Sequence, residues 1–377
     1  MKWYLLLPCL AMNVTGVWYQ RHTILEISND LEKFNNMGTI QRSQNHSTDD
    51  VVLANALSLA GTNVTEKYPE IEKQLPTMWN QIKSLYYSQT TGPVILGKEG
   101  CANFRKQFGR NATVGIAGMF NSGTNAALRN IQLNIGIPGN NASVWGKGDD
   151  AYHDLNGILF QVPWWKHNSD LYMDRNPEAD ANILPVVVVR DPFTWRNSMC
   201  TARYETSWQG MQSSSPKFWY EKETDNKSTV RTSEIRFKLR FAPHPRTLKY
   251  ESLMELWNDF HGLYLNATFP RLLVRMEDII LCLPQVIEEV RECVGAYSKH
   301  DKIEAYTARA KSHGNKLEQQ QKDNGLLSNL IKLADANLRI ADMSDLELEY
   351  SQSKLDPELM KILQYQMPVA KKLNKES

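Results

Sequence analysis

Two short apolar runs stand out along the chain, and each precedes a segment that favours a helix. Residues 114–117 make up the first run, and apolar residues then recur at the spacing of one helical face at Leu128, Ile131 and Ile135. The second run, residues 183–189 with the sequence ILPVVVV, consists largely of β-branched residues. Such a run is typical of a strand that is buried on both faces. The pattern therefore predicts two buried strands of one sheet.

Strand and helix continue to alternate beyond these runs. Further strands are predicted at residues 158–165 and 272–274. Helices are predicted around residues 24–34, 71–87 and 253–263, and after Pro284. Because the alternation is sustained from residue 113 onward, parallel βαβ units are expected. The predicted fold class is α/β, a P-loop-like parallel sheet flanked by helices, with helical N-terminal and C-terminal extensions.

The same pattern divides the chain into regions. Residues 1–19 form an apolar leader, residues 20–112 a helical stem or cap, residues 113–297 the α/β core, and residues 298–377 a helical C-terminal extension of that core. With 377 residues, of which 42% are hydrophobic, the chain can bury a sizeable core. Its net charge of +1 and its lack of long blocks of like charge argue against a nucleic-acid binder.

The leader favours entry into the secretory pathway. Lys2 is followed by the apolar run WYLLLPCLAM, which has about the length of a signal peptide. The apolar stretch up to Tyr19 contains a Pro and an Asn and lies at the short limit for a spanning helix, so a short membrane anchor of the Golgi type is the second interpretation. A buried N-terminal segment of a cytosolic protein is the third.

Asparagine and cysteine usage bears on the same question. N-x-[ST] sequons imply surface loops in the secretory pathway where they are used. They begin at Asn13, Asn45, Asn63, Asn111, Asn141, Asn226 and Asn266. The cysteines outside the leader are Cys101, Cys200, Cys282 and Cys293. They are compatible with two disulfides in an oxidising lumen and equally with free thiols. No CxxC or His/Cys spacing indicates zinc, and no metal site is predicted.

A turn between the first strand and its helix has the chemistry of an anion site. Gly123 can adopt the backbone angles that a sharp strand-to-helix turn needs. Ser122 and Thr124 place hydroxyl and N–H groups at a helix N-terminus, where the helix dipole favours an anion. A Walker A loop would require a Lys directly before the Ser or Thr, and none is present. The turn suits a phosphate or a sulfate, although an ordinary capped turn uses the same residue types.

The second strand ends in Arg190-Asp191-Pro192, and Ser198 follows. Arg190 is therefore expected at the carboxyl end of a central strand, where open α/β sheets bind ligands. Its planar guanidinium can bind phosphate oxygens bidentately. Ser198 lies in a helix predicted over residues 195–204, from which it can face the same phosphate. A surface ion pair between Arg190 and Asp191 is the alternative interpretation.

These residues resemble the motifs of the sulfotransferase family that uses 3′-phosphoadenosine 5′-phosphosulfate (PAPS). The family's 5′-phosphosulfate loop, K-S-G-T before a helix, is similar to Asn121-Ser122-Gly123-Thr124-Asn125. Its 3′-phosphate motif is an Arg, a Pro two residues on and a Ser eight residues on, and it is similar to Arg190, Pro192 and Ser198. A third landmark, a strand that ends before Glu-Asp, is similar to residues 272–278. The resemblance covers residues 113–295.

The resemblance implies a sulfotransferase that moves a sulfuryl group from PAPS to a hydroxyl acceptor, expected to be a glycan in the Golgi lumen. It implies that residues 121–125 hold the 5′-phosphosulfate and that Arg190 and Ser198 hold the 3′-phosphate. The family's loop, however, carries a Lys where this chain has Asn121. A neutral amide stabilises developing charge less than a cation does, so some transition-state stabilisation is expected to be lost.

The family often has a Lys and a His near the end of its second strand, which is similar to Lys166-His167. The resemblance implies that His167 takes the proton of the acceptor hydroxyl, a role that suits its ordinary pKa. Lys166 would help to hold the sulfuryl group and would supply the charge that Asn121 lacks. An exposed basic pair at a strand end is the alternative, and His153 and Asp154 are reserve candidates for the base.

The roles of two later segments, and two alternative functions of the chain, are not decided by these motifs. The polar residues 209–246 are interpreted as a solvated loop or as an acceptor wall suited to an acidic glycan. The resemblance implies that residues 311–314 correspond to the family's basic loop that closes the cofactor site, although the usual pattern of that loop is absent. The other functions are a P-loop kinase-like phosphotransferase, and a catalytically impaired relative that binds a nucleotide or a glycan without turnover.

Overall fold

The computed structural model describes most of the chain after residue 68. The described residues are 56, 58–59, 69–87, 92–137, 144–145, 152–176, 178–208, 219–224, 227–232, 234–306, 325–341 and 343–368. The predictions for residues 1–19, 24–34 and 311–314 lie outside them. Among the helices in these ranges, none is long and apolar enough to cross a membrane.

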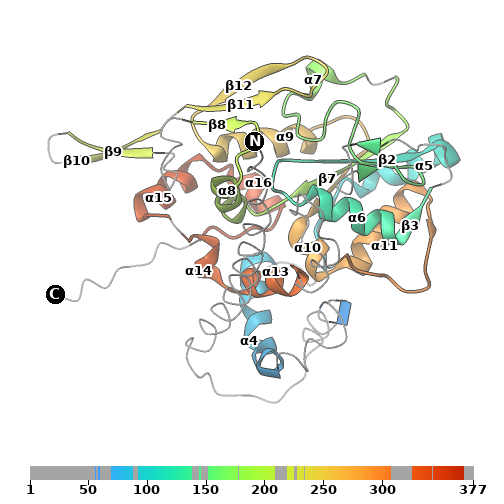
Figure 1. Cartoon of the computed structure of the whole chain (residues 1–377), viewed down its shortest axis with the longest axis horizontal. Coiled ribbons are helices and arrows are strands. Elements are labelled where there is room, and N and C mark those ends of the chain that lie inside the picture. Colours follow the sequence, from blue (N-terminus) through green and yellow to red (C-terminus); the bar gives the residue numbers. More distant parts are fainter. Residues whose placement is uncertain are drawn as a thin grey trace, which may run out of the picture.

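A mostly parallel sheet of five strands lies at the centre of the molecule (Figure 1). In spatial order, its strands are β1 (Ile95–Leu96), β13 (Leu272–Arg275), β7 (Ile183–Val189), β2 (Thr113–Gly118) and β6 (Ile158–Leu159). β13, β7, β2 and β6 run parallel, and β1 pairs with β13 in the antiparallel direction. This sheet confirms the α/β prediction.

The two predicted central strands, β2 and β7, lie side by side, and every residue of both is buried. Their register pairs Thr113 with Ile183 at one end and Gly118 with Val188 at the other. Because parallel strands end at the same edge of a sheet, the turn after β2 and Arg190 after β7 emerge next to each other. This register positions the candidate site.

Helices cover both faces of the sheet. Alternate residues of β7 point to opposite faces, as expected for a strand. Val186 and Val188 belong to a core shared with α5 (Cys101–Phe108), α6 (Thr124–Asn134) and α11 (Leu283–Val294). Val187 and Val189 belong to a core shared with α4 (Pro69–Tyr86), α8 (Pro192–Thr201) and α9 (Leu253–Leu265). Figure 1 shows α6 and α11 on the side of the sheet away from α8.

The remaining elements are short. The helices are α7 (Leu171–Asp174), α10 (Met276–Leu281), α13 (Gly325–Ala334), α14 (Ala336–Arg339), α15 (Asp345–Lys354) and α16 (Pro357–Ile362), with 3-10 turns at Lys98–Gly100 and Gly109–Asn111. Small antiparallel pairs join β3 (Ile135–Gly136) to β14 (Tyr297–Ser298) and β4 (Val144–Trp145) to β5 (Tyr152–His153). The described helices after residue 324 pack on α4 and on the α8–α9 side of the core.

The polar segment of residues 209–246 contains strands, so its interpretation as a loop is wrong where the structure describes it. β9 (Trp219–Thr224) and β10 (Lys227–Thr232) form a hairpin, and β11 (Ile235–Leu239) pairs with β8 (Thr206–Ser207) and β12 (Arg246–Tyr250). In β11, Ile235, Phe237 and Leu239 are buried, and the two residues between them are exposed. This alternation is the strand signal that the high polarity of the segment concealed.

The strand predicted at residues 158–165 is much shorter than expected. β6 ends at Leu159, and the chain then follows β2 through turns. The Val162 N–H donates to the Ile116 carbonyl at 3.1 Å, and the Gly118 N–H donates to the Lys166 carbonyl at 2.8 Å. The regular pairing therefore ends before Pro163, and single backbone hydrogen bonds to β2 occur on both sides of it.

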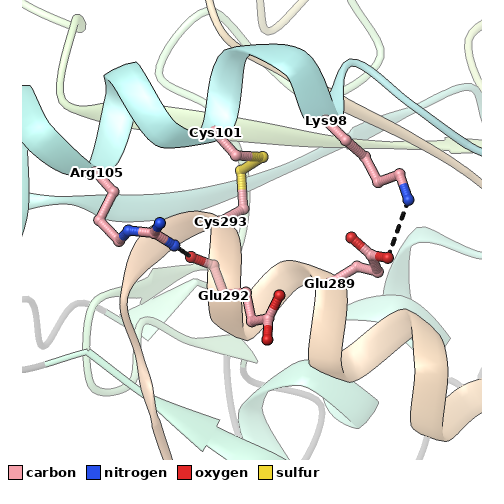
Figure 2. The surroundings of a disulfide bond; sticks show 6 residues. All are labelled: Lys98, Cys101, Arg105, Glu289, Glu292 and Cys293. Atoms are coloured by element: carbon pink, nitrogen blue, oxygen red, sulfur yellow. Dashed lines mark hydrogen bonds and ion pairs between the residues drawn. A yellow bond between two sulfur atoms is a disulfide. The ribbon is translucent and has the colours of Figure 1, made fainter.

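One disulfide ties α5 to α11 within the described residues (Figure 2). It joins Cys101 to Cys293 across 192 positions of sequence. The Lys98 ammonium lies 3.0 Å from the Glu289 carboxylate beside it, and Arg105 donates to a backbone carbonyl of α11. Cys282 is a free thiol, so the described residues contain a cysteine of each of the two alternatives.

Candidate functional site

The turn between β2 and α6 is built on two glycines. Gly118 has φ +146, and a Cβ there would lie 2.7 Å from Ser122 Oγ. Gly123 is the N-cap of α6 with φ +98, and a Cβ there would overlap the Met276 sulfur. No side chain caps α6, so its first N–H groups lack partners within the helix. The Ser122 hydroxyl donates to the Met119 carbonyl at 2.8 Å, which fixes the turn from within.

Arg190 joins the two predicted phosphate segments. Its Nη1 donates to Ser198 Oγ at 2.9 Å and to the Asn121 carbonyl at 3.0 Å. The Trp257 indole donates to the Arg190 carbonyl at 2.9 Å and holds the backbone. The structure thus brings Arg190 and Ser198 together beside the turn. The alternative partner, Asp191, is engaged elsewhere, as the N-cap of α8 and in an ion pair with a C-terminal residue.

Asn121 faces away from the turn that it precedes. Its backbone has φ +60, in the left-handed region. Its side-chain amide donates to the carbonyls of Ser198 at 3.3 Å and Ala202 at 2.6 Å. The amide therefore attaches the turn to the end of α8. It does not occupy the position that the motif's Lys would be expected to take.

Lys166 places a cation at the start of α6. The side chain is buried, and its ammonium donates to Asn125 Oδ1 at 3.0 Å and lies 3.8 Å from the centroid of the Phe160 ring. Burial disfavours the charged form and lowers the pKa of Lys166 to about 7. Because Asn125 belongs to the first turn of α6, the amino group lies next to the proposed anion site.

His167 lies on the other side of the same turn. Its Nδ1 is 2.6 Å from the Gly118 carbonyl, and a carbonyl only accepts, so Nδ1 carries the proton and Nε2 holds the lone pair. Burial is the larger and the charge of Lys166 the smaller of two causes that lower the pKa of His167 well below its ordinary value. The imidazole is therefore neutral at physiological pH. It can accept a proton at Nε2, although as a weaker base than a solvated histidine.

The reserve candidates occupy other places. The Asp154 carboxylate accepts from the Phe160 N–H at 2.6 Å and shapes the turn around β6. His153 lies in β5, which pairs only with β4 among the described strands. Neither residue takes part in a described contact with the turn between β2 and α6.

The third landmark forms a buried network behind the site. Arg275 donates to both oxygens of Asp278, at 2.7 and 2.9 Å, and both side chains are fully buried. Glu277 accepts from the Asp191 N–H at 3.1 Å and from the Tyr365 hydroxyl at 2.8 Å. The Glu277 contacts hold the chain after β7 to α10 and to the C-terminal segment, and the Arg275–Asp278 pair joins the end of β13 to α10, so their role is structural.

Aromatic residues around the turn, and Arg339, were not singled out from the sequence. Phe120, directly before Asn121, contacts the rings of Trp165, His167 and Tyr204. Arg339 forms the ion pair with Asp191. Aromatic residues are frequent throughout this chain, and nothing in the local sequence links Arg339 to β7. Only the tertiary structure reveals these residues.

A surface hollow of about 870 Å³ lies away from this site. It is lined by Glu234, Lys249, Tyr250, Glu251, Glu255, Tyr350 and Lys354. Lys354 pairs there with Glu251 at 2.6 Å and with Glu255 at 3.0 Å. Because each of its charged groups is already in an ion pair, the hollow offers little to an ionic ligand. Among the described residues, no group of three or more His, Cys, Asp or Glu side chains could hold a metal ion.

Comparison with known proteins found no match among family models, curated proteins or solved structures.

Proposed function

We propose that this chain is a sulfotransferase that moves a sulfuryl group from PAPS to a hydroxyl acceptor, a glycan in the lumen of the secretory pathway. The observation that carries the proposal is the contact of Arg190 with both Ser198 and the Asn121 carbonyl. Two sequence segments 69 and 8 positions away from Arg190 converge there at the carboxyl edge of β2 and β7. A 3′-phosphate and a 5′-phosphosulfate are the two anionic groups that such neighbouring sites would bind.

The residues present fit such a nucleotide. Gly118 and Gly123 have no side chains, so the backbone of the turn stays accessible to an anion. The start of α6 has no side-chain cap, and it offers N–H groups and the positive end of the helix dipole. Arg190 and Ser198 are only half-buried, so both can exchange their mutual contact for phosphate oxygens. We infer that the turn between β2 and α6 is P-loop-like in this sense, without a Walker lysine.

Each residue then has a role that follows from its position. The bound donor supplies the sulfuryl group. His167 accepts the proton of the acceptor hydroxyl at Nε2, as the acceptor oxygen bonds to sulfur and the bridging oxygen leaves with adenosine 3′,5′-bisphosphate. Residues 122–125 orient the phosphosulfate at the start of α6, and Lys166 adds a cation there.

Lys166 is the replacement for the charge that Asn121 does not provide. The contact between the Lys166 ammonium and Asn125 brings a cation to the same turn from the segment that follows β6. Burial lowers the pKa of Lys166, and a bound anion would raise it again. The site would therefore gain its full positive charge when the donor binds.

A second function is favoured by the orientation of Asn121. Its amide is committed to α8 carbonyls, so the chain lacks the direct hydrogen bond that the motif's Lys would give to the bridging oxygen. A relative that binds the nucleotide or a glycan without turnover would tolerate this arrangement. The two functions differ in one measurement, which is sulfate transfer by a protein that binds the nucleotide.

A luminal location fits two features of the described structure. The Cys101–Cys293 disulfide is of the kind that persists in oxidising compartments. The sequon residues Asn111 and Asn266 are both exposed, so each is accessible to glycosylation. Treatment of the secreted protein with a peptide N-glycosidase would test this, because the expected result is a loss of mass.

Titration calorimetry of the purified full chain with adenosine 3′,5′-bisphosphate tests the site. We expect micromolar or tighter binding, weakened about 10- to 100-fold by Arg190→Ala, because hydrogen bonds to a charged group contribute roughly 1.5–3 kcal/mol. Arg236→Ala is the matched control, since Arg236 is an exposed arginine on β11 that pairs with Glu234. Equal affinities of wild type and Arg190→Ala, or no binding at all, would exclude the assignment.

Transfer assays with labelled donor then separate the functions. Incorporation of label into a glycan acceptor, abolished by His167→Gln, supports the enzyme. Tight nucleotide binding without incorporation across an acceptor panel supports the non-catalytic relative. Magnesium-dependent binding of ATP in place of the bisphosphate would indicate a kinase-like phosphotransferase.

A further inference from the structure

A column of aromatic rings leads from the candidate base to the protein surface. The Phe120 ring lies 3.9 Å from the His167 ring, centroid to centroid, and 4.8 Å from the Tyr204 ring, to which it is parallel within 4°. Both neighbours contact Phe120 through its faces, so Phe120 lies between them. Tyr204 forms the outer end of the column and is 50% exposed.

A second branch reaches the surface at Phe241. Trp165, the residue before Lys166, lies 5.8 Å from both Phe120 and Phe241, and Phe241 is 63% exposed. The two exposed rings belong to neighbouring backbone segments, because the Lys238 N–H donates to the Glu205 carbonyl at 2.9 Å. Large exposed aromatic side chains close to a candidate active site indicate a binding surface.

The backbone around these rings is strained at two bulky residues. Trp165 has φ +73 and Tyr204 has φ +50, in a region that side chains of this size rarely adopt. Each such residue costs of the order of 1–3 kcal/mol and persists where the surroundings impose it, commonly at binding sites. The strain coincides with the residues that orient the aromatic cluster. Packing stability alone does not require Tyr204 to be held in this conformation, since half of its side chain is exposed.

We propose that Tyr204 and Phe241 form a sugar-binding subsite for the acceptor, in which a pyranose ring stacks its C–H face on the exposed aromatic faces. The negative face of an aromatic ring attracts polarised C–H groups, and the sugar hydroxyls remain at the edge, where Arg240 and Glu205 form an ion pair at 3.5 Å. The subsite rests on the proposed function, because it assigns the class of acceptor to that site.

The position of the subsite also defines which sugar it holds. Phe120 separates Tyr204 from His167, so a ring stacked on Tyr204 is not the one whose hydroxyl faces His167 Nε2. The sugar bound there is a neighbour of the reacting residue. The acceptor is therefore an oligosaccharide, and the subsite sets its affinity and not the rate of the chemical step.

Saturation-transfer NMR with methyl β-D-galactopyranoside, whose ring has a continuous C–H face, tests the subsite in the full chain. We expect saturation of that face in the wild type and a signal reduced to background in Tyr204→Ala and in Phe241→Ala. Tyr297→Ala is the matched control. Tyr297 is 49% exposed and lies in β14, beside β3 at the far end of α6, and its removal should leave the signal unchanged.

Several outcomes would overturn the subsite. The first is a wild type that shows no saturation of the sugar, and the second is a Tyr204→Ala variant that shows as much saturation as the wild type. The third is a Tyr297→Ala variant that loses as much signal as Tyr204→Ala. The fourth is displacement of the sugar by 4-methylphenol at a lower concentration than that of the sugar, which would indicate a phenolic acceptor. Calorimetry with adenosine 3′,5′-bisphosphate on the same samples separates this failure from failure of the proposed function. Nucleotide binding without sugar binding removes only the subsite, and sugar binding without nucleotide binding removes only the sulfotransferase assignment.

Discussion

Arg339 donates from two of its guanidinium nitrogens to one carboxylate oxygen of Asp191, although the two residues lie 148 positions apart in sequence. Arg339 is 1% exposed and Asp191 is fully buried. The other oxygen of Asp191 accepts from the N–H groups of Phe193 and Thr194 and caps α8. This ion pair therefore fixes the residue that follows Arg190 and the start of the helix that carries Ser198.

Loss of this ion pair should affect both stability and the 3′-phosphate site. Arg339→Met leaves the Asp191 carboxylate buried without its cation, and we expect the free energy of unfolding to fall by about 3–5 kcal/mol. We also expect the variant to lose preference for adenosine 3′,5′-bisphosphate over adenosine 5′-monophosphate, because Arg190 and Ser198 are no longer held together. Denaturant unfolding and calorimetry with both nucleotides measure the two effects.

Arg275→Met is the control for this prediction. It breaks the equally buried pair with Asp278, which does not contact Arg190 or α8 in the described structure. A similar loss of stability with an unchanged nucleotide preference is expected in the fraction that stays folded. If both variants change the preference equally, Arg339 has a structural role only.

The features predicted correctly from the sequence are those with a local signal. The run of residues 183–189 is a strand, and the turn at Gly123 starts a helix. Neighbouring parallel strands end at the same edge of a sheet, and β2 and β7 are such neighbours. The proximity of Arg190 and Ser198 to the turn after β2 could therefore be predicted. Their binding role stays a prediction.

Other features depend on contacts that no local pattern encodes. The Asn121 side chain points to α8 because its backbone adopts a left-handed conformation. The residue type alone does not predict the direction in which the side chain points. Arg339 reaches Asp191 only after the C-terminal helices pack on the core. The strand at residues 158–165 was predicted too long because apolar character continues after Leu159, where the chain leaves the regular ladder and forms turns.

Gly123→Ala should distort the backbone of the turn that forms the proposed anion site. The substitution places a Cβ at φ +98 and against the sulfur of Met276, so we expect a destabilisation of about 1–3 kcal/mol and a loss of nucleotide affinity. Gly262→Ala is the matched control. Gly262 lies inside α9 with open space where a Cβ would be added, and the substitution should stabilise the protein by roughly 0.5–1 kcal/mol. Thermal unfolding of both variants measures the contrast, and equal effects would show that the turn accepts a side chain.

The disulfide should contribute strongly to stability. Its loop spans 192 positions, and the chain-entropy relation gives a stabilisation of about 5 kcal/mol through restriction of the unfolded chain. The Cys101→Ser/Cys293→Ser double variant should therefore unfold at lower denaturant concentration than the wild type, and a reducing agent should produce the same shift in the wild type. Cys200→Ser, which leaves this disulfide intact, should unfold like the wild type. An unaffected midpoint in the double variant would mean that the bond is absent from the folded protein.

The pKa of Lys166 gives the site a pH dependence with a defined sign. In the free protein burial holds this pKa at about 7, and a bound anion favours the ammonium and raises it. Binding then takes up a proton between the two pKa values. The affinity for adenosine 3′,5′-bisphosphate should be greatest below about pH 7 and should fall as the pH rises above it, by at most about tenfold for each unit.

Lys166→Met isolates this contribution, because the phosphate groups of the nucleotide also titrate. We expect the ratio of wild-type to variant affinity to decrease from about pH 6 to about pH 8, and proton uptake, measured by calorimetry in buffers of different ionisation enthalpy, to vanish in the variant. His167 does not titrate in this range in the free protein, because burial and the charge of Lys166 hold its pKa well below the ordinary value. A ratio that is constant with pH would place the Lys166 ammonium outside the field of the bound anion, and the charge that replaces the motif's lysine would then have to come from Arg190 alone.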